Sequence, residues 1–227
     1  MQLQDFAQEM DRRIAQHDLL CHPFYRAWSA GELTSEDLRS YSRDYYHHVA
    51  AFPTYLSALH SRLSDGHLRR TVLANLAAEE IEGVPHSELW LDFAEAMGND
   101  REAVRSQNPS PETAALIESF QQIAREGSVA STLAAFYAYE SQVPRVAEFK
   151  EHGLRDLYGA SEKACRYFNL HKTADLHHSR IWRDLLQQQL ISDPENADAA
   201  LHSAEKTAQA LWKVLDGMEN RRTVQAA

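Results

Sequence analysis

The sequence predicts an all-α protein, a bundle of about seven or eight helices in a single domain that spans residues 1–227. The chain contains only 8 Gly and 7 Pro, against about 27 in an average chain of this length, which disfavours folds built on many tight turns. Apolar residues recur at the spacing of three and four that an amphipathic helix requires. No segment alternates with the period of two that is typical of a strand.

The N-terminal segment predicts two helices. Residues 3–20 place apolar side chains such as Phe6 and Met10 on one face. The aromatic stretch HPFYRAWSAGEL follows as the second helix, which Pro23 would begin and Gly31 would end.

A long helix comes next and runs through the segment SEDLRSYSRDYYHHVAAFPTYLSALHSRL. Thr34 or Ser35 is expected to cap its start, and Gly66 ends it. Residues 67–81 and 86–97 then predict two further helices, which a Gly-Val-Pro break separates.

Four helices are predicted in the C-terminal half, at residues 111–127, 128–150, 161–191 and 195–216. Ser110 before Pro111 is a typical start for the first of them. The second is the most apolar and is expected to be the most buried. Gly217 is expected to end the last helix, which would leave the residues after about 217 as a loose tail.

Charge and composition exclude several classes of protein. The 23 Lys and Arg against 33 Asp and Glu give a net charge of −10, which disfavours binding to nucleic acid. Two cysteines, Cys21 and Cys165, cannot form a disulfide scaffold and fit a reducing compartment. The N-terminal residues MQLQDFAQEMDRR lack the apolar region of a signal peptide, and no stretch of about 18 apolar residues occurs. The sequence therefore predicts a cytoplasmic protein that binds neither nucleic acid nor membranes.

The segment His171-Lys-Thr-Ala-Asp175-Leu-His-His178 carries the sharpest signal for chemistry. At about 100° per residue, His171, Asp175 and His178 share one narrow stripe of a helix, whereas His177 points elsewhere. Two imidazoles with a carboxylate between them suit iron or manganese. The alternative is a polar helix face that happens to contain histidine.

Two other segments place ligand types where the interior of a bundle would be. Glu79 and His86 lie seven residues apart, so they share a face, and the break between them could shorten their separation. Glu140 stands at the end of an apolar helix, where a buried carboxylate needs a partner. The alternatives are a solvated acidic helix end for the first pair, and an ion pair with Arg145 or Lys150 for Glu140.

Together these segments supply three histidines and three carboxylates: Glu79, His86, Glu140, His171, Asp175 and His178. This is the inventory of a dinuclear metal site in a helical bundle. The Glu-x-x-His pairs of ferritin-like bundles are absent, so a dinuclear site would belong to another scaffold.

The same segments resemble the family of the chlamydial protein associating with death domains (CADD) and its bacterial relatives, the haem-oxygenase-like dimetal oxidases. The resemblance is carried, in this order, by HPFYRAWSAGEL, YSRDYYHHVAAFPTYLSALHSR, NLAAEEIEGVPHSELW, YAYESQVPRVAEFK and the histidine-rich stretch HKTADLHH. It implies a seven-helix haem-oxygenase-like bundle with the fold of TenA and PqqC, the six residues above as metal ligands, and a homodimer.

The resemblance also implies a reaction, the O2-dependent formation of 4-aminobenzoate from the side chains of the enzyme itself. Tyr25 matches the tyrosine that supplies the ring, and Lys150 matches the lysine that supplies nitrogen. Tyr41 and Tyr167 match tyrosines that line the cavity, where they relay electrons or serve as alternative donors. The implied cofactors are a di-iron or iron–manganese pair, O2 and an external reductant; the electron donor is not identified.

Three alternatives stay open at this point. The chain could be a dimetal oxidase of the same fold that acts on an external small molecule, or a metal-free protein similar to TenA or PqqC. Lys150 could also be a surface lysine paired with Glu148 or Glu151, with Tyr25 as an aromatic cap over the bundle.

Overall fold

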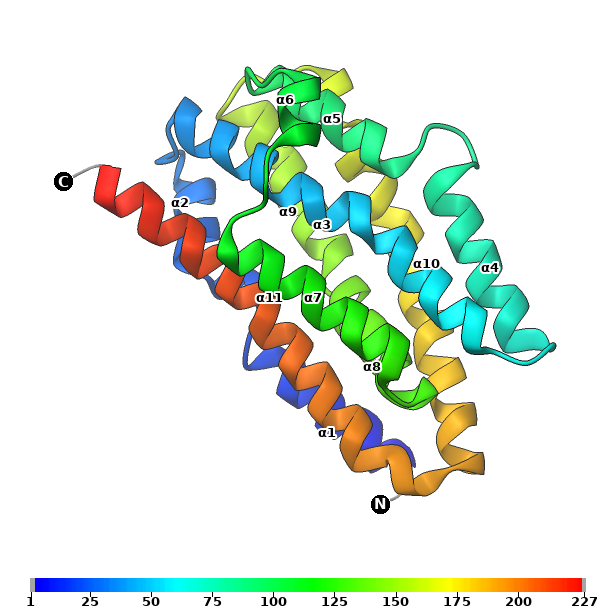
Figure 1. The fold of residues 1–227 in the computed structure, drawn as a ribbon. Helices are drawn as coiled ribbons and strands as arrows, with labels where there is room; N and C mark the ends of the chain where they lie inside the picture. The colour runs from blue at the N-terminus through cyan, green and yellow to red at the C-terminus, as the bar shows by residue number, and fades with distance from the viewer. Residues whose placement is uncertain (1–2, 226–227) are drawn as a thin grey trace.

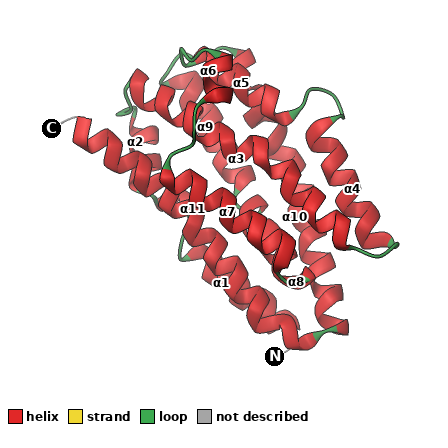
Figure 2. Ribbon diagram, in the orientation of Figure 1, coloured by secondary structure: helices red, strands yellow, loops and turns green. Residues whose placement is uncertain are grey.

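A computed structural model describes residues 3–225, in which every regular element is a helix and no strand occurs (Figures 1 and 2). The all-α prediction is therefore confirmed. The α-helices are α1 (Leu3–Ala15), α2 (Pro23–Ala30), α3 (Ser35–Arg62), α4 (His67–Glu80), α5 (His86–Ala96), α6 (Arg101–Ser106), α7 (Pro111–Glu126), α8 (Val129–Glu140), α9 (Val143–Asp156), α10 (Glu162–Ser192) and α11 (Ala197–Gln225). Short 3₁₀ helices occur at Leu19–Cys21 and Pro194–Asn196.

Helix α8 lies at the centre of the bundle. Every residue from Ala130 to Glu140 is buried, because α7, α10 and α11 all pack against this helix. Helix α3 packs against α4, α5 and α7, and α10 packs against α5, α8 and α9 (Figure 1). The last residue of α8 therefore lies deep inside the protein, next to α10.

Side-chain caps define several helix starts as the sequence predicts. Thr34 caps α3 with a reciprocal capping box, in which its side chain and that of Asp37 each accept from the other residue's backbone N–H. Ser110 caps α7 immediately before Pro111, and its hydroxyl accepts from the backbone of Thr113. Gly31 ends α2 in the left-handed conformation, with φ at 70°, which glycine adopts without a steric penalty.

The single helix predicted from residue 128 to residue 150 is wrong. The chain breaks at Ser141 and Gln142, and α8 and α9 are separate helices. Pro144 lies in the first turn of α9, where its missing N–H has no partner to lose. The Gln142 side chain supports the break, because it accepts from the backbone of Leu19 and donates to the Ala138 carbonyl.

Two other boundaries differ from the prediction. Helix α1 ends at Ala15 rather than at residue 20, because Asp18 caps a separate 3₁₀ turn by accepting from the backbone of Leu20. The polar stretch between the helices predicted at residues 86–97 and 111–127 forms a further helix, α6, which was not predicted. The Asp100 side chain caps that helix.

The loose tail predicted after residue 217 is also wrong, because α11 continues to Gln225. Gly217 does not end the helix. A Cβ atom at this position would lie 2.7 Å from the Glu112 carboxylate, so glycine permits a close approach between α11 and the start of α7. Beyond it, Arg221 pairs with Asp44 and Glu112 and so ties the end of the helix to the bundle.

Over the part of the chain that the structure describes, none of the helices combines the length and the apolar character needed to cross a membrane.

Candidate metal centre

The six predicted ligands come from four helices and meet inside the bundle. Glu79 is the penultimate residue of α4, His86 begins α5 and Glu140 ends α8, while α10 supplies the other three. We call these six residues the carboxylate–histidine cluster: Glu79, His86, Glu140, His171, Asp175 and His178. Five of them are buried, and the His178 side chain is only 12% exposed.

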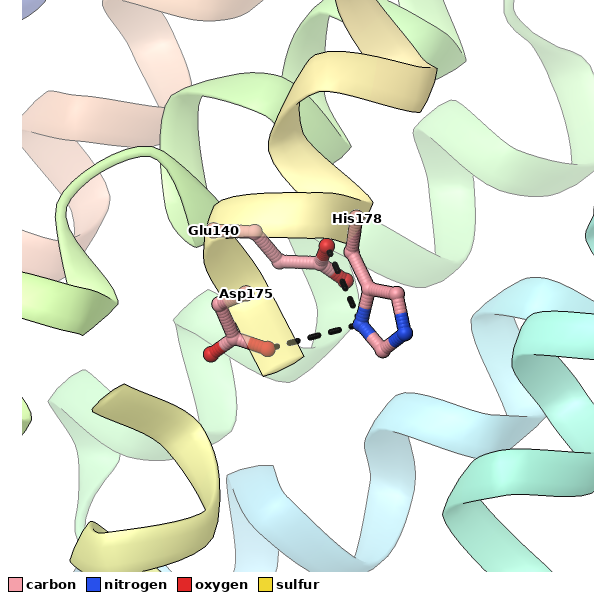
Figure 3. A group of neighbouring side chains, drawn as sticks. All are labelled: Glu140, Asp175 and His178. Atoms are coloured by element: carbon pink, nitrogen blue, oxygen red, sulfur yellow. Dashed lines mark ion pairs between the residues drawn. The ribbon is translucent and has the colours of Figure 1, made fainter. Parts of the chain in front are cut away.

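One half of the cluster consists of Glu140, Asp175 and His178, which point toward one another in Figure 3. His178 Nδ1 lies 3.5 Å from Asp175 Oδ1 and 3.8 Å from Glu140 Oε2. Each residue offers a ligand atom, and the three atoms all lie within 4.8 Å of one another. Trp182 orients the Glu140 carboxylate by donating its indole N–H to Oε2 over 2.6 Å.

The other half consists of Glu79, His86 and His171. His86 Nδ1 lies 2.7 Å from Glu79 Oε2, but the two atoms do not have hydrogen-bond geometry. The His86 and His171 rings meet edge to face, with centroids 4.7 Å apart. The halves are joined because His171 Nδ1 hydrogen-bonds Asp175 Oδ2 over 2.8 Å. His177 is exposed, as predicted.

Burial and mutual charge perturb the cluster strongly. Burial, together with the negative charges of Asp175 and Glu79, raises the pKa of Glu140 well above its usual value. Burial opposes the ionisation of Asp175, but His171 and His178 outweigh it and lower the pKa of that carboxyl. Burial likewise disfavours a charged His171, yet the Asp175 carboxylate raises its pKa. Three buried carboxylates with too little positive charge form a site that favours a cation.

The donor atoms of the cluster fit a metal centre. Four of its buried atoms have no hydrogen-bond partner among the described residues: Glu140 Oε1, His86 Nδ1, His171 Nε2 and His178 Nδ1. Buried polar atoms are rarely left without partners. A cavity of about 10 Å³ lies among Glu79, Glu140, His171 and Asp175, which is about the space that one water molecule needs. Imidazole nitrogens and carboxylate oxygens are ligands that iron and manganese accept.

A second cavity, of about 20 Å³, adjoins the cluster and contains the predicted amine. We call it the tyrosine–lysine cavity. Lys150 is buried there, and its Nζ atom contacts the Tyr41 hydroxyl. The same nitrogen lies 4.7 Å from the centroid of the Tyr41 ring and 4.9 Å from that of Tyr25. The two hydroxyls are 3.3 Å apart.

Lys150 is not a surface lysine. Glu151, one of its expected partners, pairs instead with Arg155 and Lys172, and none of the ion pairs found within residues 3–225 includes Lys150. Burial lowers the pKa of Lys150 well below its usual value. Burial therefore favours the neutral form of this amine, the form that a nitrogen nucleophile needs.

Tyr139 and Tyr167 separate the two cavities, because both residues line each of them. The ring centroid of Tyr167 lies 4.2 Å from that of His171 and 4.8 Å from that of Trp90. A single layer of aromatic side chains therefore separates the cluster from the tyrosine–lysine cavity.

The sequence predicts Tyr167 as a site residue but misses Tyr139 and Trp182. Trp182 lies one helical turn after His178, which is a usable signal for a neighbouring side chain. Tyr139 gives no such signal, because α8 is apolar and buried all round. Periodicity cannot say which way a side chain of such a helix points.

Comparisons with known proteins agree with this geometry. The profile of a family described as iron-containing redox enzymes matches residues 39–212. A relative from Chlamydia trachomatis named 4-aminobenzoate synthase is 39% identical over 214 residues, covering 93% of this chain and 91% of that protein. A relative with the same name from Nitrosomonas europaea is 37% identical over 223 residues, covering 94% of this chain and 90% of that protein.

The fold also matches a solved structure. A domain from Shewanella denitrificans, described as having a heme oxygenase-like fold, superposes with a TM-score of 0.82. It is 18% identical and covers 100% of this chain and 96% of that one. The expected haem-oxygenase-like bundle is thus confirmed.

Proposed function

Because the chain belongs to the family of iron-containing redox enzymes, it is an oxidoreductase, and we propose that it forms 4-aminobenzoate in an O2-dependent reaction that consumes its own Tyr25 and Lys150. The family resemblance inferred from the motifs is confirmed by the two relatives that carry the name 4-aminobenzoate synthase. That the ring and the nitrogen of the product come from this chain's own side chains is our proposal.

One observation carries the proposal: a buried lysine without an ion-pair partner lies against two tyrosine rings, one side chain away from a cluster of metal-ligand type. A lysine is almost never fully buried without an ion-pair partner. A purely structural role would be filled better by an apolar residue, because desolvating the amine costs free energy. The amine is therefore retained for its chemistry.

The cluster would hold two ions, with Glu79, His86 and His171 supplying ligands to one and Glu140, Asp175 and His178 to the other. Asp175 also hydrogen-bonds His171 and so links the two ligand groups. A di-iron or iron–manganese pair would supply the oxidising power of O2 to this site. An external reductant would provide the remaining electrons.

The proposed product defines which bonds of the chain must change. The ring and Cβ of Tyr25 provide the carbon skeleton, so the Cα–Cβ bond breaks and Cβ is oxidised to the carboxylate. The nitrogen of Lys150 replaces the phenolic oxygen at Cζ of the oxidised ring, and that oxygen leaves as water. The Nζ–Cε bond then breaks by hydrolysis, which leaves Cε as an aldehyde carbon while the ring is reduced. The Tyr25 ring is within reach of that nitrogen, with 4.9 Å between Nζ and the ring centroid.

Tyr41 is placed to move a proton in this reaction. Its hydroxyl lies between the Tyr25 hydroxyl and the Lys150 amine and contacts both. A neutral amine in contact with a phenol accepts the phenolic proton when the ring is oxidised. Because Nζ contacts the Tyr41 hydroxyl directly, Tyr41 is the second candidate for the ring donor.

The alternatives fit the cavities less well. Sites for external small molecules are clefts of about 300–1,000 Å³, whereas the tyrosine–lysine cavity measures about 20 Å³. A substrate that is part of the chain needs no such space. The metal-free alternative that uses a cysteine nucleophile finds no support either, because Cys21 is exposed and neither Cys21 nor Cys165 lines the described cavities. The homodimer stays a prediction.

Isotope labelling tests the proposal. Protein labelled with ¹⁵N only in lysine is loaded with iron and manganese, reduced and exposed to O2, and the small molecules and the intact chain are weighed by mass spectrometry. We expect ¹⁵N-labelled 4-aminobenzoate and a chain that has lost the Tyr25 side chain. Tyr25→Phe and Lys150→Met should give no product, whereas Tyr137→Phe should match the unmodified protein.

Two results would change this assignment. Full product from Tyr25→Phe but none from Tyr41→Phe would make Tyr41 the ring donor. Unlabelled product from the labelled protein would show that the nitrogen comes from outside the chain, and the self-consuming reaction would then be rejected.

A further inference from the structure

Trp28 connects the tyrosine–lysine cavity to the protein surface. Its ring centroid lies 5.5 Å from that of Tyr41 and 6.3 Å from that of Tyr25. It also lies 6.1 Å from the ring centroid of Tyr158, which is half-buried and lies two residues after the end of α9. Two aromatic rings, Trp28 and Tyr158, thus lead from the reacting tyrosine pair to the surface.

The other oxidisable neighbours of the pair lead inward. Besides Trp28, the tyrosine and tryptophan rings described next to Tyr41 are Tyr45 and Trp90. Both line the same cavity, and Trp90 continues to Tyr167 and the cluster. Of these neighbours, Trp28 is therefore the one that leads from the tyrosine pair toward the protein surface.

Tyrosine and tryptophan are the side chains most readily oxidised by one electron, and electron transfer between rings in contact is much faster than between distant ones. From this arrangement we propose that Trp28 and Tyr158 carry oxidising equivalents out of the tyrosine–lysine cavity to the surface, where a small one-electron reductant quenches them. The inference rests on the proposed function, because it starts from an oxidised Tyr25 or Tyr41.

Trp28 is suited to pass the charge on rather than to hold it. Its side chain is fully buried, and its indole N–H has no hydrogen-bond partner among the described residues. An oxidised Trp28 thus has no base to take its proton and stays a strongly oxidising radical cation. Tyr158 differs, because the residue is only half-buried and its hydroxyl donates to the Trp28 carbonyl over 3.0 Å, so an oxidised Tyr158 can release its proton toward water.

The electrons and protons balance along this path. Tyr41 first loses an electron toward the cluster and gives its proton to the Lys150 amine. It then recovers an electron from Trp28 and takes the proton back from Lys150. Trp28 recovers its electron from Tyr158, which releases a proton to water. A thiol or ascorbate then returns one electron to Tyr158 as water returns the proton. The net change is one electron from the reductant for each oxidising equivalent removed.

A glycine on α9 makes room for this route. A Cβ atom at Gly153 would lie 2.5 Å from Trp28 Nε1, so any other residue would push the indole away from its place. Gly153 lies one turn after Lys150 on the same helix. Helix α9 therefore positions both the amine and the indole beside Tyr41.

The route can be tested without metal, because rings in contact exchange electrons in either direction. Metal-free protein is illuminated with ruthenium tris(bipyridine) and persulfate, an oxidant too large to enter the 20 Å³ cavity. Oxidation of the peptides that contain Tyr25 and Tyr41 is then measured by mass spectrometry. We expect Tyr158→Phe to reduce it several-fold, while Tyr137→Phe, a tyrosine outside the route whose hydroxyl bonds Asp11, leaves it unchanged.

A second measurement uses the metal-loaded protein. After exposure to O2, the tyrosyl radical followed by electron paramagnetic resonance should decay several-fold more slowly with ascorbate in Tyr158→Phe than in Tyr137→Phe. Equal buried oxidation and equal decay in the two variants would overturn the route even if 4-aminobenzoate forms. Slower transfer in Tyr158→Phe with no 4-aminobenzoate would instead support the route and reject the proposed function.

Discussion

The two cavities at the centre of the bundle both lie among buried side chains but have opposite chemistry. The carboxylate–histidine cluster contains three carboxylates, and burial with like charge raises the pKa of Glu140. The tyrosine–lysine cavity contains one amine among aromatic rings, and burial alone lowers the pKa of Lys150. Among the described residues, Tyr139 and Tyr167 are the ones that line both cavities.

This difference shows how one fold can prepare two reactants side by side. Burial disfavours the charged form of every group, so each cavity responds according to the partners it provides. The cluster has an excess of negative charge that a cation relieves. The tyrosine–lysine cavity has no carboxylate in its lining, so burial favours the neutral form of its amine. Each of the predictions below alters one side of this contrast.

The largest effect is expected from removing a carboxylate of the cluster. Glu140→Gln keeps the side-chain shape and an acceptor for Trp182, but it removes the negative charge and an anionic ligand. We expect at least one of the two ions to be lost, as measured by metal analysis of the purified protein. Glu118→Gln, at an exposed carboxylate, should keep full metal content. Two ions retained by Glu140→Gln would show that the ligands are misassigned.

Metal addition should stabilise the protein through the same residues. A ligand present at 100 times its dissociation constant stabilises the folded state by about 2.7 kcal/mol. We therefore expect anaerobic Fe²⁺ to raise the free energy of unfolding in urea by about this amount in the unmodified protein. In Glu140→Gln the gain should be much smaller. An equal gain in both proteins would place the bound iron outside the cluster.

Replacing the amine tests the other cavity. The pKa of Lys150 is lowered in the folded protein but is about 10.4 in an unfolded chain. Between these values the unfolded chain binds the additional proton, so this group makes the free energy of unfolding rise with pH, by up to about 1.4 kcal/mol per pH unit.

Lys150→Met should remove that pH dependence and be more stable than the unmodified protein at neutral pH. The difference between the two should shrink as the pH rises toward about 10, as measured by urea unfolding of the metal-free proteins. Lys213→Met, at an exposed lysine, is the control and should follow the unmodified protein. A pH-independent difference for Lys150→Met would mean that the amine is charged in the folded state.

The sequence predicts the cluster better than it predicts the cavity beside it. His171, Asp175 and His178 lie on one face of any regular helix, so their spacing identifies them without knowledge of the packing. The environment of Lys150 depends on the break at Ser141 and Gln142, which local propensity did not reveal. Pro144 falls inside the single helix predicted over residues 128–150, yet it lies in the first turn of α9. The turn at Ser141 and Gln142 therefore sets the direction of α9.

The same limit explains the errors at the end of the chain. Gly217 is a good stop signal in isolation, but its role depends on Glu112, a residue about a hundred positions earlier that the sequence does not place beside it. The helix starts at Thr34 and Ser110 were predicted correctly because their caps are local. The end of the last helix was not, because it depends on a distant contact.

The smallest effect is expected from a change at Tyr167, which lines both cavities. Tyr167→Phe keeps the ring that packs on His171 and Trp90 and removes only a hydroxyl, so the stability should change by no more than about 1 kcal/mol. Metal content should be unchanged, because neither half of the cluster loses a ligand. The rate of 4-aminobenzoate formation should nevertheless fall, since phenylalanine is far harder to oxidise.

Tyr55→Phe is the matched control for this variant. Tyr55 is a buried tyrosine whose hydroxyl has no partner among residues 3–225 and which lines neither cavity. Its variant should keep both the metal content and the rate. Loss of metal from Tyr167→Phe would make Tyr167 part of the metal shell, and the cavities would then be one site rather than two. An unchanged rate would leave Tyr139, the other residue that lines both cavities, as the side chain that connects them.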